Sequence, residues 1–336
     1  MAAAVPTTPT SVGIDQDGTD YSYFAKVKMG SNGTVMNMLL DTGAGTSWVM
    51  GHDCDSVPCK RHNNFGAIDS TTFKSKDVEF ELHYGSGNVS GTIATDSLTI
   101  AGFTLQPTFG IAKVASDDFK NFPIDGILGL AQSKGPHETF IETLVAAKVL
   151  TANMFGVSIS RSTDGPNTGV LNFGAPDPSR FVGDLAYTAV QGPDKDDWAI
   201  PMDGISFDGK KADIQFKVAY IDTGTSYIFS KKEEVLRLHG TIPGATTADN
   251  VTYKVPCTTT LPLIFTFGAN SYSISARDWV GPNVKGQCTS NIYGHDVVGD
   301  AWLLGDTFLK NVYAVFDIDA NRIGMYKLDY FLYESN

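Results

Sequence analysis

Two aspartates lie in matching apolar and glycine-rich surroundings. Asp41 stands in "MNMLLDTGAGTSWVMG", residues 36–51, and Asp222 stands in "VAYIDTGTSYIFS", residues 218–230. In both segments an apolar run ends at the aspartate and Thr-Gly follows it. Burying an isolated carboxylate is costly, so one such residue is readily explained as a structural aspartate at a turn. The second copy favours a shared chemical role for the two carboxylates.

Two facing carboxylates can hydrolyse amides. Held about 3 Å apart, they cannot both be charged, so they share one proton over a broad acidic range and titrate as a unit. One carboxylate takes a proton from a water molecule while the other donates a proton to a carbonyl oxygen. The water then attacks the amide carbon directly, with no covalent intermediate. The pattern therefore predicts peptide hydrolysis without a metal ion or other cofactor.

The segments around the aspartates predict how they are positioned. The apolar runs before Asp41 and Asp222 predict buried strands, and Thr-Gly allows a tight turn, so each carboxylate should emerge at a strand end beside main-chain amides. We expect the hydroxyls of Thr42 and Thr223 to bond to main chain and lock the two loops against each other.

The order of motifs indicates an internal duplication. Each DTG is followed at a similar distance by an apolar pair and a glycine, in "GILGLA" at Gly129 and in "WLLGDT" at Gly305. Two long copies imply two lobes related by a pseudo-twofold axis. Because both copies are on one chain, we expect a monomer.

Length and composition agree with two globular lobes. The chain has 336 residues, 42% hydrophobic and 18% charged, which suits about two lobes. The segment "VQGPDKDDW", residues 190–198, has linker composition. We therefore expect residues 1–190 to form an N-terminal lobe with the first DTG and the flap defined below, and residues 191–336 to form a C-terminal lobe with the second DTG.

The fold class is predicted to be mostly β. Short strand patterns alternate with turn signals, for example "YFAKVKMG", "VEFELHYG", "SLTIAG" and "YAVFDID", and there are 34 glycines. Helical patterns are few. One is "PHETFIETLVAAKVL", which should start at Pro136, and the other is "KKEEVLRLHG", which should end at Gly240.

Charge and hydropathy exclude two classes of partner. The net charge is −12 and the pI is about 4.8, so nucleic acid is not expected to bind. No apolar run approaches the roughly 18 residues of a membrane helix. The start "MAAAVPTTPT" lacks the basic and apolar regions of a signal peptide. Either the protein is intracellular, or its targeting segment and any pro-segment are absent from this form.

Cysteines and sequons leave alternatives open. Cys54, Cys59, Cys257 and Cys288 allow three disulfide connectivities, of which adjacent pairing closes one short and one medium loop. Free buried thiols are the alternative, and zinc is disfavoured because no CxxC or histidine pair accompanies them. Candidate N-glycosylation sites are Asn32, Asn88 and Asn250.

From about residue 12 to 328 the chain resembles a pepsin-family aspartic protease, and the extended match suggests the secreted fungal type. The motifs that carry the resemblance are "DTGAGTSWV", "YGSGNVSG", "DGILGLA", "IDTGTS" and "WLLGDTF". The resemblance implies a bilobal fold of two β-barrel-like lobes with a few short helices and an active-site cleft between the lobes. It also implies an endopeptidase, with Asp41 and Asp222 as its catalytic pair.

The resemblance assigns further site residues. "HYGSGNVSG" would be the flap, a hairpin that closes over the substrate, with Tyr84 as its working side chain, Gly85, Ser86 and Gly87 in or beside its turn, and Trp48 bonded to the Tyr84 hydroxyl. Gly43 and Gly224 would hold the substrate backbone. The expected ligands are extended peptides or proteins and statine-type inhibitors.

The resemblance also implies a history for the chain. Its cysteines would pair as Cys54–Cys59 and Cys257–Cys288, which places the protein in an oxidising compartment, outside the cell or in a vacuole. The family is made with a signal peptide and an inhibitory pro-segment. Met1 would then be an added start in front of a mature chain derived from a zymogen.

One departure from the family pattern lies beside a catalytic residue. The first motif usually reads DTGS, with the serine donating a hydrogen bond to the aspartate, but here the residue is Ala44, whereas the second motif keeps Thr225. A donated hydrogen bond favours the ionised carboxylate. We expect its absence to move the acid limb of the pH–rate profile to higher pH.

A second departure lies in the flap. Ser86 stands where some fungal relatives carry an acidic residue and accept lysine before the cut. We therefore expect large apolar or aromatic residues on both sides of the scissile bond. Phe119, Phe122 and Ile127 are candidate walls of the subsite before the cut, and simple core packing is the alternative for each.

Two other classes of protein compete with the enzyme. A catalytically silent pepsin-like protein that binds or inhibits other proteins would carry a damaged DTG or lack the flap tyrosine, whereas Asp41, Asp222 and Tyr84 are all present. A β-rich lectin or structural sandwich would explain the strands but not the duplicated DTG. The sequence therefore favours the enzyme.

Overall fold

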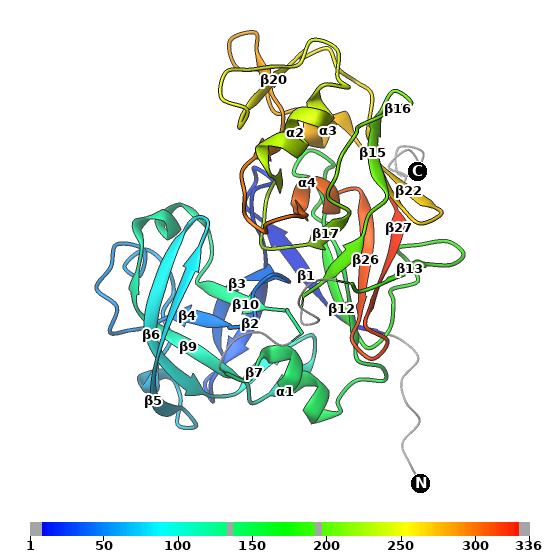
Figure 1. Cartoon of the computed structure of the whole chain (residues 1–336). Coiled ribbons are helices and arrows are strands. Elements are labelled where there is room, and N and C mark those ends of the chain that lie inside the picture. Colours follow the sequence, from blue (N-terminus) through cyan, green and yellow to red (C-terminus); the bar gives the residue numbers. More distant parts are fainter. Residues whose placement is uncertain (1–8, 133–136, 192–196, 329–336) are drawn as a thin grey trace. The chain divides into compact units, whose positions relative to one another are not determined.

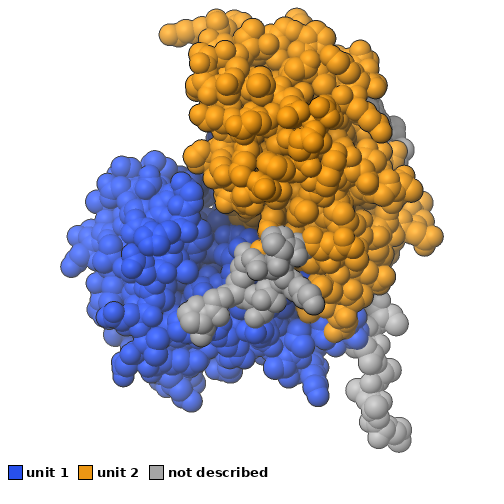
Figure 2. Space-filling view, viewed as in Figure 1, with its two compact units in different colours: residues 1–177 blue, residues 178–336 orange. Residues whose placement is uncertain are grey.

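The structure, a computed structural model, describes residues 9–132, 137–191 and 197–328. The chain divides into two compact units, residues 1–177 and 178–336, coloured blue and orange in Figure 2. The expected boundary between residues 190 and 191 falls later in the chain. Most of the expected linker lies outside the described residues, so that boundary stays a prediction.

The first unit is built mainly from strands (Figure 1). Its single described α-helix is α1 (Phe140–Ala147), and its two described 3-10 helices are η1 (Ala67–Asp69) and η2 (Asp117–Asn121). Its strands are β1 (Thr10–Gln16), β2 (Tyr23–Met29), β3 (Thr34–Asp41), β4 (Trp48–Met50), β5 (Lys74–Tyr84), β6 (Gly87–Thr95), β7 (Leu98–Ile100), β8 (Phe103–Leu105), β9 (Thr108–Ala115), β10 (Gly126–Gly129), β11 (Met154–Ser158) and β12 (Val170–Phe173).

The second unit has the same character. Its described helices are α2 (Lys232–His239), α3 (Ala276–Trp279) and α4 (Asp306–Leu309). Its strands are β13 (Ala186–Ala189), β14 (Ala199–Pro201), β15 (Gly204–Phe207), β16 (Lys210–Lys211), β17 (Val218–Ile221), β18 (Ile228–Ser230), β19 (Thr246–Thr247), β20 (Tyr253–Val255), β21 (Leu263–Phe267), β22 (Asn270–Ile274), β23 (Cys288–Thr289), β24 (Ile292–Gly294), β25 (Trp302–Leu304), β26 (Val312–Asp317) and β27 (Arg322–Lys327). The prediction of a mostly β protein is confirmed.

The two units repeat one five-strand order. In the first unit the neighbours run β2-β3-β10-β4-β9, and in the second they run β14-β17-β25-β18-β24. The relative directions also match, because both series read antiparallel, parallel, antiparallel, parallel. The predicted duplication is therefore confirmed in strand order. In both series the described strands form open sheets rather than closed barrels.

Sequence explains why the strands that lead to the aspartates lie inside their sheets. Each of them alternates buried with partly exposed residues, and each pairs with a parallel strand that is buried along its whole length. Leu40 in β3 and Leu128 in its parallel partner β10 are fully buried, as are Ile221 in β17 and Leu304 in β25. Each aspartate is thus held at the end of a strand that is buried on one face.

The predicted helices form, with a different start for the first. The helix α1 begins at Phe140, because Thr139 accepts a hydrogen bond from the Glu142 amide and Glu142 accepts one from the Thr139 amide, a capping box. Pro136, where the helix was expected to start, lies outside the described residues. The second helix, α2, ends at Gly240 as predicted.

Candidate functional site

Asp41 is the last residue of β3 and is held by main chain on two sides. The parallel partner β10 places Gly129 opposite it, and the Leu130 amide donates to the Asp41 carbonyl oxygen at 2.7 Å. The Gly43 amide donates to Oδ1 of the Asp41 side chain at 2.9 Å. The residue is only 7% exposed, so its carboxylate is a buried acceptor at a strand end, as the sequence predicted.

Asp222 follows β17 in the same manner. Its amide donates to the carbonyl oxygen of Leu304 in β25 at 3.0 Å, and the Gly224 amide donates to its Oδ1 at 2.9 Å. It is 8% exposed. The two carboxylates therefore occupy closely matched local settings, each in its own unit.

Glycines of the duplicated motif explain why these loops can pack so tightly. A Cβ on Gly129 would lie 2.6 Å from the carbonyl oxygen of Ala44, and a Cβ on Gly305 would lie 2.0 Å from that of Thr225. The Asp306 amide donates to the same Thr225 oxygen at 2.7 Å, and the Ala131 amide donates to the Ala44 oxygen at 3.1 Å. Only glycine fits where the strand passes the aspartate loop.

The loops differ in one donor. The hydroxyl of Thr225 donates to Oδ2 of Asp222 at 2.6 Å. The corresponding residue after Asp41 is Ala44, whose methyl group has no donor and packs against an apolar cluster. Thr42 and Thr223 are buried, and their locking role stays a prediction.

Strands β5 and β6 form the hairpin predicted as the flap. The strands pair antiparallel up to Tyr84 opposite Gly87, which leaves Gly85 and Ser86 as the two-residue loop. Gly87 has a positive φ of 140°, where residues other than glycine are disfavoured. A Cβ on Gly85 would meet open space, so of the two glycines only Gly87 shows a backbone requirement.

Tyr84 is held against Trp48 and Phe119. The Trp48 Nε1–H donates to the Tyr84 hydroxyl oxygen at 2.9 Å, as the family resemblance implied. The Phe119 ring lies edge-on to both aromatic rings, with centroids 6.1 Å from Tyr84 and 5.3 Å from Trp48. Burial raises the pKa of Tyr84 strongly, the negative charge of Asp41 raises it further, and the bond from Trp48 lowers it. The hydroxyl is therefore neutral throughout the acid and neutral range.

The expected wall residues lie in the same cluster. Phe119 and Ile127 are each 2% exposed and pack with Trp48, while Tyr84, Phe122 and Leu39 are partly buried against that cluster. Sequence reasoning missed Leu39, although strand alternation before Asp41 carries its signal. Phe119 and Ile127 pack as core residues, and their contact with substrate stays a prediction.

Asp125 is a second residue that sequence reasoning missed. It is 2% exposed and accepts hydrogen bonds from the Asn37 amide and from both the amide and the side chain of Asn63, at 2.8 to 3.0 Å. It thereby ties β3 and the segment around Asn63 to the start of β10. Its signal was the acidic residue directly before the apolar "GILGLA" strand.

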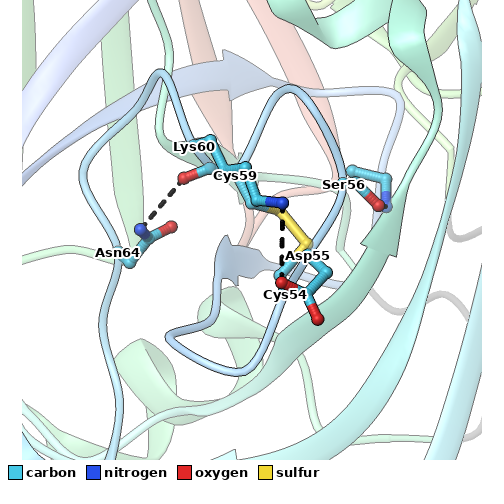
Figure 3. The surroundings of a disulfide bond; sticks show 7 residues. Cys54, Asp55, Ser56, Cys59, Lys60 and Asn64 are labelled. Carbon is cyan, nitrogen blue, oxygen red and sulfur yellow. Dashed lines mark hydrogen bonds and ion pairs between the residues drawn. A yellow bond between two sulfur atoms is a disulfide. The ribbon is translucent and has the colours of Figure 1, made fainter.

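Both cysteine pairs implied by the resemblance are bonded. Cys54–Cys59 closes a short loop, and the side chain of Asn64, which follows the loop, donates to the Cys59 carbonyl oxygen at 3.0 Å (Figure 3). Cys257–Cys288 spans 31 residues of the second unit. These two bonds use all four cysteines of the sequence.

The sequons differ in their surroundings. Asn32 lies exposed in the turn between β2 and β3, and Asn250 lies exposed with a positive φ of 57°. Asn88 is half-buried near the start of β6, beside the flap turn. Asn32 and Asn250 therefore offer more open attachment points than Asn88.

Among the described residues, no group of histidine, cysteine, aspartate or glutamate has the arrangement of a metal site. In the same residues no helix is long and apolar enough to cross a membrane.

Comparison with known proteins gives consistent matches. A family model for eukaryotic aspartyl proteases matches residues 22–328. Aspartic-type endopeptidase ctsD of Aspergillus fumigatus is 45% identical over 329 residues, which cover 96% of this chain and 69% of that protein. Probable aspartic-type endopeptidase CTSD of Trichophyton verrucosum is 43% identical over 330 residues, covering 96% of this chain but 64% of that protein. Cathepsin E-B of Xenopus laevis is 32% identical over 318 residues, covering 91% and 79%.

Proposed function

The chain belongs to the eukaryotic aspartyl protease family and is an aspartic endopeptidase, and we propose that Asp41 and Asp222 together activate the water that cleaves the peptide bond. The observation that carries this proposal is the matched setting of the two carboxylates. Each lies at the end of a strand that is buried on one face, accepts an amide hydrogen bond at 2.9 Å from the glycine two residues on, and is under 10% exposed. A structural aspartate needs no such counterpart.

The proposed reaction is general acid–base catalysis. One carboxylate accepts a proton from the water, whose oxygen bonds to the amide carbon, while the other gives its proton to the carbonyl oxygen. The tetrahedral species then collapses as the C–N bond breaks, the amine nitrogen takes up a proton, and the two carboxyl groups return to their starting protonation. Main-chain donors at Gly43 and Gly224 fix the planes of the carboxylates, so little reorganisation is needed during the reaction.

Tyr84 and the main chain around the flap turn are proposed to hold the substrate. Because the pKa of Tyr84 is raised, its hydroxyl stays protonated, and with its oxygen already accepting from Trp48 its proton is available for donation. Gly85, Ser86, Gly43 and Gly224 offer main-chain groups to an extended peptide. We propose that Thr42 and Thr223 lock the two aspartate loops.

The proposed specificity is for large apolar or aromatic residues on both sides of the cut. This specificity is supported by Phe119 and Ile127, which belong to one apolar cluster, and by Phe122, which packs against it. Ser86 gives a substrate lysine no charged partner at the flap tip. Digestion of a peptide library tests this directly. We expect Phe, Leu and Tyr beside the cleaved bond, and a digest dominated by lysine before the cut would contradict the proposal.

The alternative of a silent pepsin-like binding protein is not supported, because the homologues are named endopeptidases. Cleavage itself is tested by incubating an unfolded protein substrate between pH 2 and 7 with and without a statine-type inhibitor. We expect cleavage in the acid range that the inhibitor abolishes. A folded, disulfide-intact sample that binds the inhibitor but cleaves nothing would support the binding protein instead.

We further propose that the protein is a secreted monomer, with a vacuole as the less favoured location. The two disulfides support an oxidising compartment, and the net charge of −12 gives no support to binding of nucleic acid. Asn32 and Asn250 are the proposed glycosylation sites if the secretory route is taken.

A further inference from the structure

The flap strand β6 is attached to the segment that carries Phe119 through one serine. Pairing between β6 and β9 ends at Val89 opposite Ala115, and Ser116 is the next residue after β9. The Ser116 amide donates to the carbonyl oxygen of Asn88 at 2.9 Å, and the Asn88 amide donates to the Ser116 Oγ at 3.1 Å. We call these two hydrogen bonds the Ser116 bridge.

In this bridge the Asn88 amide donates to a side-chain oxygen, whereas in a continued strand pair it would donate to a main-chain carbonyl oxygen. The carbonyl oxygen of Ser116 instead accepts from the Phe119 amide at 3.2 Å, which starts the 3-10 helix η2. The Ser116 hydroxyl therefore replaces the carbonyl in the ladder, so β9 can end and η2 can begin without leaving the Asn88 amide unpaired. An alanine could not make this replacement.

The hydroxyl also departs from the usual role of a serine at this position. Ser116 is the N-cap of η2, where serine side chains commonly accept a hydrogen bond from the helix. In this helix no such cap bond forms, and the hydroxyl binds the flap strand instead. The Ser116 hydroxyl thus bonds to the flap strand and not to the helix.

The Ser116 Oγ also packs closely against the flap turn. A Cβ on Gly87 would lie 2.3 Å from Ser116 Oγ and 3.2 Å from the Phe119 ring. Phe119 in turn contacts Tyr84, the residue opposite Gly87 in the hairpin. Ser116 therefore touches the flap on one side and begins the segment that carries the apolar wall on the other.

We propose that Ser116 is a positioning residue that couples the flap to the apolar wall, so that Tyr84 and Phe119 keep one arrangement when substrate binds. This inference rests on the proposed function, because it treats Tyr84 as a substrate-holding group. It assigns to Ser116 an effect on how strongly the enzyme distinguishes a large side chain before the cut from a small one.

Kinetics of Ser116→Ala test the coupling. The number of active sites is measured by inhibitor titration, and kcat/KM is expressed per active site. For a peptide with Phe before the cut, kcat/KM should fall about tenfold, because the variant loses one hydrogen bond and leaves the Asn88 amide unsatisfied. For the matching peptide with Ala before the cut, kcat/KM should fall less. The ratio of kcat/KM for the Phe peptide to that for the Ala peptide should therefore decrease. Ser116→Thr keeps the hydroxyl and should restore both values. The control is Asp117→Ala, at the residue after Ser116. It removes only an exposed ion pair with Lys120 and should behave as wild type.

Amide hydrogen exchange supplies a readout that does not need catalysis. The Asn88 amide should exchange about tenfold faster in Ser116→Ala than in wild type or Asp117→Ala. If Ser116→Ala does not fold, Ser116→Cys, whose thiol is a weaker acceptor, replaces it with a smaller expected effect in the same direction.

The outcomes separate this inference from the proposed function. Unchanged kcat/KM, an unchanged Phe/Ala ratio or unchanged exchange at Asn88 would overturn the coupling, as would a loss of folded protein with normal kinetics per active site. An inactive wild type whose Asn88 exchange still depends on Ser116 would contradict the proposed function while supporting the bridge.

Discussion

Asp41 and Asp222 are oriented by the same contact, a hydrogen bond from the amide of the glycine two residues further on. Their difference lies one residue beyond that glycine. Thr225 gives Asp222 a hydroxyl donor at 2.6 Å, and Ala44 has none to give. Because a donor stabilises the ionised carboxylate, this difference should be visible in how activity depends on pH.

Ala44→Ser is predicted to move the acid limb of the kcat/KM profile to lower pH, by about one unit, because it adds a hydrogen bond to the ionised form of Asp41. The measurement is peptide hydrolysis from pH 2 to 7 for wild type and variant. Ala131→Ser, at the residue whose amide donates to the Ala44 carbonyl oxygen, is a control for added polarity near the loop. Coincident acid limbs for wild type and Ala44→Ser would contradict the prediction.

His239, at the end of α2, is a residue whose protonation should limit stability in acid. Its ring is 3% exposed, stacks on Tyr253 at 3.9 Å and bonds through Nδ1 to the Val235 carbonyl oxygen at 2.8 Å. Burial lowers its pKa from 6.5 to about 4, with the Val235 bond opposing the shift. The folded protein therefore binds this proton less readily than the unfolded chain does. The neutral His239 ring therefore gives its full contribution to the unfolding free energy above pH 6.5. That contribution is lost as the pH falls from 6.5 towards 4.

His239→Phe should remove this loss while keeping the ring stacked on Tyr253. Between pH 7 and pH 4 the wild type is predicted to lose about 3 kcal/mol of unfolding free energy more than the variant. Denaturant unfolding at both pH values measures the difference, and His295→Phe, at an exposed histidine of the same unit, is the control. Parallel pH dependence of wild type and His239→Phe would refute the assignment.

At the scale of elements, the glycines of the duplicated motif determine how closely a strand can pass each aspartate loop. Gly305→Ala would bring a methyl group against the Thr225 carbonyl oxygen, and the loop would have to move. We predict a loss of about 1–3 kcal/mol or more in stability, together with a lower kcat. Thermal unfolding and single-turnover kinetics measure the two effects.

Gly204→Ala is the matched control for that substitution, because a Cβ there would meet nothing within 4 Å. It should leave stability and activity close to wild type. Equal effects of the two substitutions would show that the close approach at Gly305 does not constrain the loop.

Much of this arrangement could be predicted from sequence, because the signals were local. Apolar runs before Asp41 and Asp222 predicted the buried strands, and repetition of DTG with a later glycine predicted the duplicated order. Proline is a common first residue of a helix, which predicts a start at Pro136. The described helix α1 instead begins after the Thr139–Glu142 capping box. The sequence carried that box signature as well.

Other features depended on tertiary contacts that no local pattern reveals. Ser116 reads as an ordinary loop serine until the pairing of β6 with β9 places it opposite Asn88. Asp125 likewise acquires its role only when Asn37 and Asn63 approach it. The disulfide pairing, for which spacing alone left three possibilities, came from family resemblance rather than from the residues themselves.

At the scale of the whole molecule, the disulfides should contribute unequally to stability. Cys257–Cys288 is closed across 31 residues and Cys54–Cys59 across 5. A longer closed loop removes more entropy from the unfolded chain. Replacing both cysteines by serine is predicted to cost about 4 kcal/mol for the long loop and about 2 kcal/mol for the short one.

Denaturant unfolding of the two double variants checks this order. A larger loss from Cys54→Ser/Cys59→Ser would mean that local contacts of the short loop, such as the bond from Asn64 to Cys59, outweigh the chain entropy.

If Asp41 and Asp222 act as one catalytic unit, neutralising either carboxylate should abolish catalysis. Hydrolysis of a Phe-containing peptide is therefore measured across pH 2 to 7 for wild type, Asp41→Asn, Asp222→Asn and the exposed control Asp117→Asn. We expect acid-range activity for wild type and the control, and a loss of at least about 10³-fold in kcat for either aspartate variant with folding intact. Near wild-type activity in Asp41→Asn or in Asp222→Asn would show that the two carboxylates do not act as a unit.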